Sequence, residues 1–399
     1  MQRFTAREYL KIDIANSFGL DKLDWDDRIA WFNANESTLH TKLADAAEPA
    51  LYYAGVNAWN TVQQGEPSGY PISLDATASG LQLLAVLTGD RKAAEICNVV
   101  DTGHRRDAYT SVYQNMLAKT GDISKITRED TKSAIMKALY GSTAEPKRVF
   151  GEGALLRHFY DTVEELTPGA WELNTAFLHM WDPTAYKYSW VLPDNFHVHV
   201  KVMRPVIETV NFLDEPFEIT TLVNAPIERG RALAANLIHS LDGLIVREMV
   251  RRCSYDPKKI KQIGAWLDDP YERSFISTKD DKIVVKLWEN YKISGYLSAR
   301  ILDHLAPRNF GHINRVDIKE LIQNLPSKPF QVLTVHDCFR CLPAYGNDLR
   351  TQYNDQLHLI AKSNMLNYLL SQLIGRKINV KQLDPYLFLD IAQANYALS

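Results

Sequence analysis

Two short apolar runs that carry an aspartate, one near each end of the chain, constrain this sequence more than any other feature. In residues 71–82, an apolar run too short for a helix ends at Asp75, and small residues then lead into a segment of helical period. This pattern predicts a strand, a turn and a helix, with Asp75 at the carboxyl end of the strand. A carboxylate at such a position more often caps the helix or accepts loop amides than takes part in catalysis.

The second run, residues 332–339, is also rich in β-forming residues and contains His336 and Asp337. Two strand-borne carboxylates, Asp75 and Asp337, suit a chemistry that needs two hard oxygen ligands side by side. From this pattern alone, the capping and the metal-binding interpretations of Asp75 both stay open.

The composition is that of an ordinary globular protein, with 46% hydrophobic and 23% charged residues among 399. No apolar stretch is long enough to span a membrane, the first residues lack a signal-peptide core, and four cysteines do not make a disulfide framework. We therefore expect a soluble cytoplasmic protein of one elaborate domain or two subdomains, without a membrane partner.

The net charge of −3 gives no sign of nucleic-acid binding, so any such binding requires a locally basic cleft. Basic clusters occur at residues 104–106, at Arg247, Arg251 and Arg252, and at residues 258–261. Each cluster alone is more often a solvated face.

The periodicity predicts an α+β protein that is mostly helical. Residues 1–66 have a helical pattern that begins without a cap of its own, residues 186–223 alternate as strands do, and a long helix runs from about 231 to 252. Residues 253–328 are mixed helical and polar, and we find no chemical motif in them. Cys338 and Cys341 are rejected as a zinc site, because a spacing of three on an extended strand points the two sulfurs to opposite faces.

The best-defined helix starts at Thr127, its N-cap, with Asp130 completing a capping box, and stops at Gly141. Its residues at four-residue spacing form one stripe: Arg128, Lys132, Met136 and Tyr140. The stripe suits an amphipathic helix with a basic edge and Tyr140 in the core. It equally suits a helix that holds a triphosphate with its two cations while Tyr140 packs on a sugar or a base.

Together these pieces indicate nucleotidyl transfer, in which two divalent ions held by Asp75 and Asp337 act beside a helix that binds a triphosphate. Within the long helical segment 231–252, His239 taken alone is interpreted as a hydrogen-bonded core histidine.

The motifs resemble those of the single-subunit RNA polymerases of phages and mitochondria, relatives of the family A DNA polymerases with a right-hand fold. Residues 75–82 are similar to the family's motif A, Arg128, Lys132 and Tyr140 to motif B, and His336-Asp337 to motif C. Residues 239–243, His-Ser-Leu-Asp-Gly, resemble a further segment of the family. The four segments occur in the family's order.

The resemblance implies a role for each matching residue. Asp75 and Asp337 would bind two Mg²⁺ ions with the Ala76 carbonyl as a further ligand, and Gly80 would leave room for a ribose 2′-hydroxyl and so select ribonucleotides. Arg128 and Lys132 would bind the triphosphate, and Tyr140 would lie at the ribose and base of the nucleotide. Tyr109 would stand at the start of the fingers, and His336 would flank the metals near the primer end.

The same resemblance implies a palm at 1–103 and 246–399 and fingers at 104–245, with an insertion at 253–328 and a C-terminal foot. It also implies that the chain lacks its own complete N-terminal and thumb region, as in the larger subunit of the split RNA polymerase of Enquatrovirus-type phages. The expected partners are a DNA template, nascent RNA, ribonucleoside triphosphates, a smaller subunit and an accessory factor for promoter opening. Ile245 stands where relatives place a histidine.

Two alternatives remain: a family A DNA polymerase, which Gly80 disfavours, and a non-catalytic interaction subunit on a polymerase scaffold, which the intact Asp75 and Asp337 disfavour.

Overall fold

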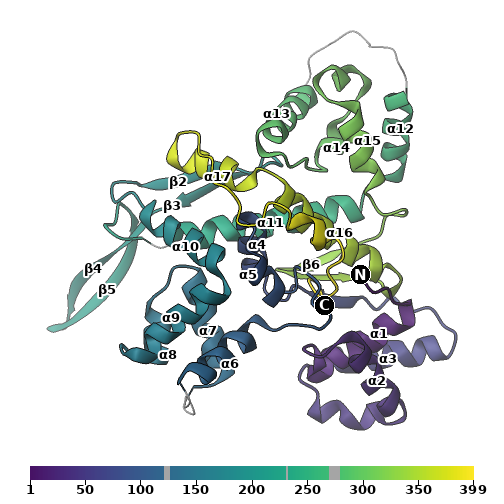
Figure 1. Cartoon of the computed structure of the whole chain (residues 1–399), viewed down its shortest axis with the longest axis horizontal. Coiled ribbons are helices and arrows are strands. Elements are labelled where there is room, and N and C mark those ends of the chain that lie inside the picture. The colour runs from purple at the N-terminus through teal and green to yellow at the C-terminus, as the bar shows by residue number, and fades with distance from the viewer. Residues whose placement is uncertain (121–125, 231, 269–278) are drawn as a thin grey trace.

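The computed structural model describes residues 1–120, 126–230, 232–268 and 279–399, and helices dominate it, as the sequence predicts (Figure 1). A group of helices at the N-terminal end packs under a small central sheet. It consists of α1 (Ala6–Ala15), a π-helical turn η1 (Asn16–Leu20), α2 (Trp25–Asn35), a 3₁₀ segment η2 (Glu36–Asp45) and α3 (Pro49–Gln63). The expectation that this group begins without a cap is wrong. Thr5 caps α1 in a capping box with Glu8.

The central sheet has three antiparallel strands in the order β1 (Ile72–Asp75), β7 (Cys338–Cys341) and β6 (Leu333–Val335). Asp75 pairs in register with Cys338, so the pairing joins the two ends of the chain. The second apolar run is not a single strand. Val335 pairs with Cys338, which leaves His336 and Asp337 as a two-residue hairpin loop instead of strand residues.

The outer edge of β1 is covered by residues 397–399. The Asp75 amide donates to the Ser399 carbonyl at 3.3 Å, the Ser399 amide returns a bond to Asp75 at 2.9 Å, and the Thr77 amide donates to Ala397 at 3.3 Å. The expected C-terminal foot therefore lies directly against the strand that carries Asp75.

The main hydrophobic core is built by helices on both sides of this sheet in the sequence. Among them, α4 packs against α10, α11 and α16, and α6 packs against α7 and α9. Their bounds are α4 (Ser79–Thr88), α5 (Arg91–Ile96), α6 (Ala108–Thr120), α7 (Arg128–Leu139), α8 (Ala144–Phe150), α9 (Ala154–Leu166), α10 (Pro168–His179), α11 (Ala232–Cys253), α16 (Gly346–Lys362), α17 (Met365–Ile374) and α18 (Phe388–Ile391).

The predicted limits of α7 are confirmed, with Thr127 as the cap and Gly141 at a φ of 81°. Arg231, at the expected start of α11, lies outside the described residues.

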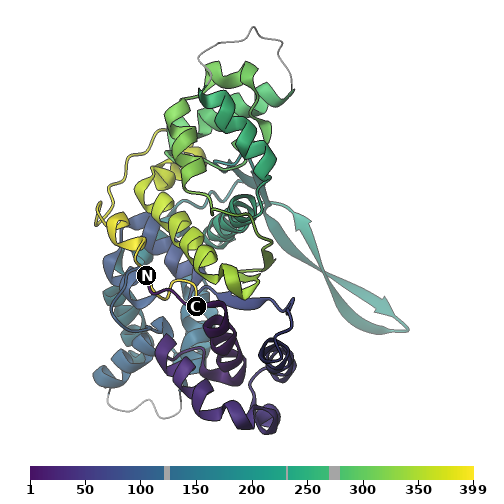
Figure 2. The same ribbon diagram turned by 90° about the vertical axis from the view of Figure 1, so that its right-hand side faces the viewer.

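The expected β-rich segment forms two separate antiparallel pairs. One consists of β2 (Lys187–Val191) and β3 (His197–Lys201), and the other of β4 (Met203–Phe212) and β5 (Glu215–Asn224). The β4–β5 pair is a long ribbon that extends away from the body of the molecule (Figure 2). Every side chain of β5 is exposed, so the ribbon contributes little to the core.

The segment between α11 and β6 forms a helical group with a core of its own, set apart from the main core. Ile263, Val284, Ile301 and Ile318 are fully buried within this group. It contains α12 (Pro257–Asp268), α13 (Lys279–Ser294), α14 (Ile301–His304), a 3₁₀ turn η3 (Pro307–His312) and α15 (Arg315–Gln323). Part of the expected insertion, residues 269–278, lies outside the described residues. None of the helices in the described part of the chain is long and apolar enough to cross a membrane.

Candidate active site

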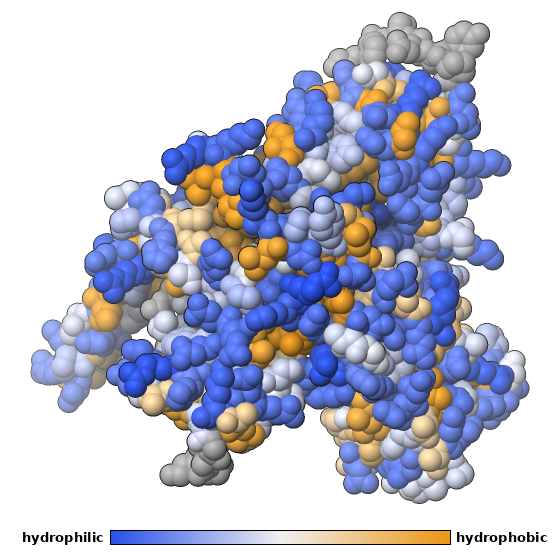
Figure 3. Space-filling model, viewed as in Figure 1, coloured by the Kyte–Doolittle hydropathy of each residue, from blue (hydrophilic) through white to orange (hydrophobic). Residues whose placement is uncertain are grey.

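A cleft of about 660 Å³ lies between the N-terminal helices, the central sheet and α7. The space-filling view shows the molecule hollowed between the N-terminal helices and the helices α6–α9 (Figure 3). The volume is in the range of sites that bind a drug-sized ligand or a cofactor. The cleft is lined by Asp75, Ala76, Gly80, Tyr109, Arg128, Lys132, Met136, Tyr140 and Asp337. It therefore collects the residues proposed from the sequence, with the exception of His336.

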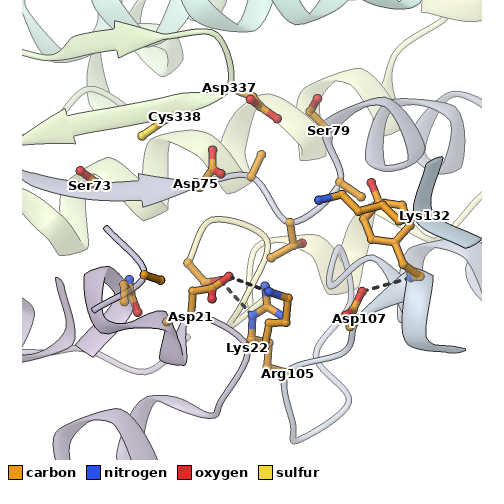
Figure 4. A pocket seen from close by; sticks show the side chains of 18 of the residues that line it. Asp21, Lys22, Ser73, Asp75, Ser79, Arg105, Asp107, Lys132, Asp337 and Cys338 are labelled. Carbon is orange, nitrogen blue, oxygen red and sulfur yellow. Dashed lines mark hydrogen bonds and ion pairs between the residues drawn. The ribbon is translucent and has the colours of Figure 1, made fainter. Parts of the chain in front are cut away.

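Asp75 ends β1, Asp337 lies in the adjoining β6–β7 loop, and both line the cleft (Figure 4). The amide of Ala76 donates to the backbone carbonyl of Asp337 at 3.2 Å, which locks the end of β1 to the β6–β7 loop. The carboxylate of Asp75 is solvent-accessible, but the cleft walls surround it. This desolvation and the nearby charge of Asp337 raise the pKa of Asp75 to about 6. Asp75 is not the helix cap, because the N-cap of α4 is Ala78.

These carboxylates suit a magnesium ion better than a metal held entirely by protein. No group of three or more His, Cys, Asp or Glu side chains that could hold a metal occurs among the described residues. Mg²⁺ is commonly held by one or two carboxylates, with water and substrate phosphates supplying the other ligands. Two carboxylates that repel each other across an open cleft fit that requirement.

The loop after Asp75 is fixed by Gln82, the last residue of the motif A-like segment, whose side-chain amide donates to the Thr77 hydroxyl at 3.1 Å. Gln82 is fully buried, and its side-chain amide donates to the carbonyls of Cys97 and Ala397 at 3.0 and 2.9 Å. Its side-chain oxygen accepts a bond from the Tyr353 hydroxyl at 2.7 Å. The sequence offers one signal for this role, because Gln82 is a polar residue at a core position of an otherwise apolar helix.

The two cations of α7 have different surroundings. Arg128 donates to Asp107 through its Nε at 2.9 Å and forms a second contact through Nη2, and it also contacts Thr110 at 2.9 Å. Although burial opposes the shift, this ion pair lowers the pKa of Asp107. The ammonium of Lys132 lies 5.6 Å from the ring centre of Tyr109 and faces the cleft (Figure 4). Lys132 is therefore the more available cation for an anionic ligand.

Tyr140 lies at the C-cap of α7 and is half-buried in the cleft wall, not in the core. A Cβ atom on Gly80 would lie 2.6 Å from its hydroxyl, so the glycine allows the tyrosine to approach α4. On the other side, the ring of His239 lies 5.2 Å from the ring of Tyr140. His239 is exposed, so the interpretation of it as a core histidine is wrong.

A third aspartate, Asp242, approaches the site from α11. Burial and the charge of Asp337 raise its pKa to about 7, while a hydrogen bond with Ser79 opposes the shift. The charge of Asp242 also contributes, after burial, to raising the pKa of Tyr140 to about 12. Asp242 belongs to the family-like segment 239–243, but it was not among the site residues predicted from the sequence. Ile245, one turn further on, is buried.

His336 has a φ of 55°, which is a left-handed backbone conformation that residues other than glycine seldom adopt. Its side chain is exposed at the hairpin loop beside Asp337. The loop therefore holds a backbone conformation of higher energy immediately next to a candidate ligand, which is a common feature of functional sites.

Comparison with known proteins points to a class of polymerase. The sequence model of the family described as DNA-dependent RNA polymerase matches residues 5–149. This segment contains β1 and α7, with Asp75, Lys132 and Tyr140, and ends before Asp242 and Asp337.

The chain is also similar to individual RNA polymerases. It is 23% identical over 307 residues to the DNA-directed RNA polymerase of Pseudomonas phage phiKMV, an alignment that covers 59% of this chain and 36% of that protein. It is 30% identical over 159 residues to a probable DNA-directed RNA polymerase of Neurospora crassa, covering 34% of this chain and 17% of that protein. The mitochondrial DNA-directed RNA polymerase of Schizosaccharomyces pombe is 28% identical over 168 residues, covering 34% of this chain and 14% of that protein. The chain thus spans little more than a third of the length of the phage polymerase and less than a fifth of the length of the two fungal proteins.

Proposed function

We propose that this chain is the catalytic part of a DNA-dependent RNA polymerase that adds ribonucleotides to the 3′ end of an RNA strand opposite a DNA template. One observation carries the proposal: Asp75 and Asp337 lie in one cleft with Lys132. The match of residues 5–149 to the polymerase family and the names of the similar proteins support an RNA polymerase activity.

In this proposal Asp75 and Asp337 hold two Mg²⁺ ions, with the Ala76 carbonyl as a further ligand. The ions would lower the pKa of the attacking hydroxyl and neutralise charge on the leaving pyrophosphate. Lys132, with Arg128 once it exchanges Asp107 for phosphate, would bind the triphosphate and stabilise the charge that develops on it. His336 would flank the primer end.

Tyr140 and Gly80 would form the ribose site together, and Tyr109, which also lines the cleft, would stand at the start of the fingers in the nucleotide site. The Tyr140 hydroxyl lies 2.6 Å from the position that a Cβ atom on Gly80 would take, and the ribose 2′-hydroxyl would bind beside this contact. The expected substrates are therefore ribonucleoside triphosphates.

The domain assignment follows from the same resemblance. Residues 1–103 and 246–399 would be the palm, and residues 104–245 the fingers of a right-hand fold. The smaller subunit that supplies the N-terminal elements, the accessory factor for promoter opening and the transcription of phage genes are parts of the proposal that rest on the resemblance to the split phage enzyme. Co-purification from cells that express both genes would test the subunit.

Primer extension on a DNA template tests the activity, with ribonucleotides and Mg²⁺ and with the chain both alone and together with any co-purified subunit. We expect extension in at least one arm and its loss, by a factor of about 10³ or more, in Asp337→Asn. Asp161→Asn, the same change at an exposed position on α9, is the matched control and should leave extension unchanged. Normal extension by folded Asp337→Asn, or none by the wild-type protein in either arm, would overturn the proposal.

The two alternatives have distinct outcomes in the same assay. A DNA polymerase would prefer deoxyribonucleotides on the same template. A non-catalytic subunit would tolerate Asp75→Ala and Asp337→Ala in the assembled complex.

A further inference from the structure

A buried carboxylate from the N-terminal helices reaches the strand that carries Asp75. Asp13, on α1, is almost fully buried, at 3% exposure. One of its oxygens accepts the backbone N–H of Ser73 at 2.7 Å, and the other accepts the hydroxyl of Tyr70, also at 2.7 Å. Both carboxylate oxygens therefore hold the segment that leads into Asp75, and one of them bonds the strand itself.

The bond from the Ser73 amide to Asp13 lies at a point where it can affect the placement of β1. β1 is only four residues long and is an edge strand, with β7 on one side. On its other side, residues 397–399 bond Asp75 and Thr77, and Asp13 bonds Ser73. A short edge strand has few bonds to fix its register, so each one has a large share in its placement. Ser73 is two residues before Asp75, and their amides point to the same edge.

The surrounding structure is adapted to this contact. A Cβ atom on Gly55, in α3, would lie 2.9 Å from the side chain of Ile14, the neighbour of Asp13, so the absence of a side chain there lets α3 pack closely against α1 beside this contact. Across the sheet, Ser73 is in register with Arg340, whose positive charge is among the influences on Asp13. Asp13, Ser73 and Arg340 all line the cleft wall.

We propose that Asp13 and Tyr70 are a positioning pair: they hold Ser73 so that β1 presents the Asp75 carboxylate beside Asp337 at the spacing that two bound cations require. The inference rests on the proposed function, since it assigns the pair to the proposed metal site. Asp13 does not touch substrate or metal in this arrangement. Residues that orient ligands in this indirect way commonly change metal affinity or activity 10–100-fold when they are mutated.

Three variants separate positioning from simple stabilisation of the fold. Asp13→Ala removes the acceptor of the Ser73 amide, and Tyr70→Phe removes one of the two bonds to Asp13. Asp13→Asn keeps an oxygen that can accept the Ser73 N–H, and its amide can donate to the Tyr70 oxygen. Tyr52→Phe is the matched control. The Tyr52 hydroxyl is also buried in the N-terminal helices and donates to the Leu39 carbonyl at 2.9 Å, away from β1.

Two measurements do not depend on enzymatic activity. They are the Mg²⁺ affinity, by calorimetric titration of the whole protein, and the hydrogen exchange of the Ser73 and Asp75 amides. A thermal unfolding curve is recorded for each variant. We expect Asp13→Ala to weaken Mg²⁺ binding about 10-fold or more and to speed exchange at both amides. Tyr70→Phe should give a smaller change in the same direction, while Asp13→Asn stays close to the wild type. The Tyr52→Phe control should lower the unfolding temperature without either effect.

Unchanged Mg²⁺ affinity and unchanged exchange in folded Asp13→Ala, or in Tyr70→Phe if the alanine variant does not fold, would overturn the inference. Equal effects in Tyr52→Phe would overturn it as well, because a general loss of stability would then explain them. The proposed function fails separately, if folded Asp337→Asn extends primers normally or if the wild-type protein extends none in either arm.

Discussion

The hydroxyl of Tyr140 occupies the space in which any residue larger than glycine at position 80 would place its first side-chain carbon. That carbon would lie 2.6 Å from the hydroxyl oxygen and 3.3 Å from the ring carbon that bears it. The two residues belong to different segments, α4 and the end of α7, so this contact joins two walls of the cleft.

Gly80→Ala is expected to displace Tyr140 and to raise the KM for ribonucleotides roughly 10-fold, because a misplaced ring no longer orients the sugar. Tyr140→Phe removes the atom at closest approach, so the double variant should lose less than the sum of the two single losses. A double-mutant cycle on KM and kcat measures this coupling. Strict additivity would show that the two residues act independently.

Asp242→Asn is expected to change stability in a pH-dependent way in metal-free protein. The pKa of Asp242 is about 7 in the folded state, against an ordinary aspartate value of 3.8, so between these pH values the folded state binds more protons than the unfolded state. Stability of the wild type therefore falls as pH rises through this window, and the loss is complete above about pH 7. Asparagine carries no such charge and can still accept a bond from Ser79.

The difference in unfolding temperature between Asp242→Asn and the wild type should accordingly grow in favour of the variant from pH 5 to pH 8. Thermal unfolding in a chelator measures it, and Asp161→Asn, at an exposed site, should show no such trend. A difference that stays constant over this range would contradict the assignment.

His336→Val is expected to destabilise the protein by about 1–2 kcal/mol, because a β-branched residue is strained at a φ of 55°. His336→Gly relieves the strain but adds backbone freedom to the unfolded chain, so its net effect on stability should stay within about 1 kcal/mol. Denaturant titration compares the two, with Thr334→Val on the adjoining strand as the control. Equal stability of the valine and glycine variants would argue against strain at this loop.

Replacing residues 204–223 by a two-residue Asn-Gly turn should leave the free energy of unfolding within about 1 kcal/mol of the wild type. Met203 pairs with Asn224, so a short turn can close the ribbon at its base, and the side chains removed are mostly exposed. Trp190→Ala, at a buried position on β2, should cost about 3–5 kcal/mol in the same denaturant titration. A large loss on removal of the ribbon would mean that it packs on the body in solution.

Ile301→Ala is expected to cost about 2–5 kcal/mol, because Ile301 is fully buried in the separate core of α12–α15. Since that core is distinct from the main one, hydrogen exchange should speed up in the described parts of 257–323 and stay slow in β1 and β7. Equal acceleration throughout the chain would show that the two cores unfold as one unit.

Sequence patterns were sufficient for local structure wherever the signal is local. The limits of α7 follow from Thr127, Asp130 and Gly141, because a cap and a left-handed glycine act within one turn of the helix. The β-rich segment was equally clear, since alternation is a property of neighbouring residues. By contrast, the β-rich run predicts strand at His336-Asp337, where the structure has a hairpin loop, because a left-handed histidine has no signature in such a run.

The sequence by itself determined which residues are candidates for the chemistry: Asp75, Asp337, Lys132 and Tyr140 stand out by type, spacing and resemblance. Only the tertiary structure decided how they are arranged. It tied Arg128 to Asp107, brought Asp242 towards Asp337, placed Tyr140 over Gly80 and set Asp13 against the edge of β1. The physical reason is that charge interactions, steric contacts and hydrogen bonds depend on distances in space, and these partners are separated along the chain by segments whose packing no local pattern specifies.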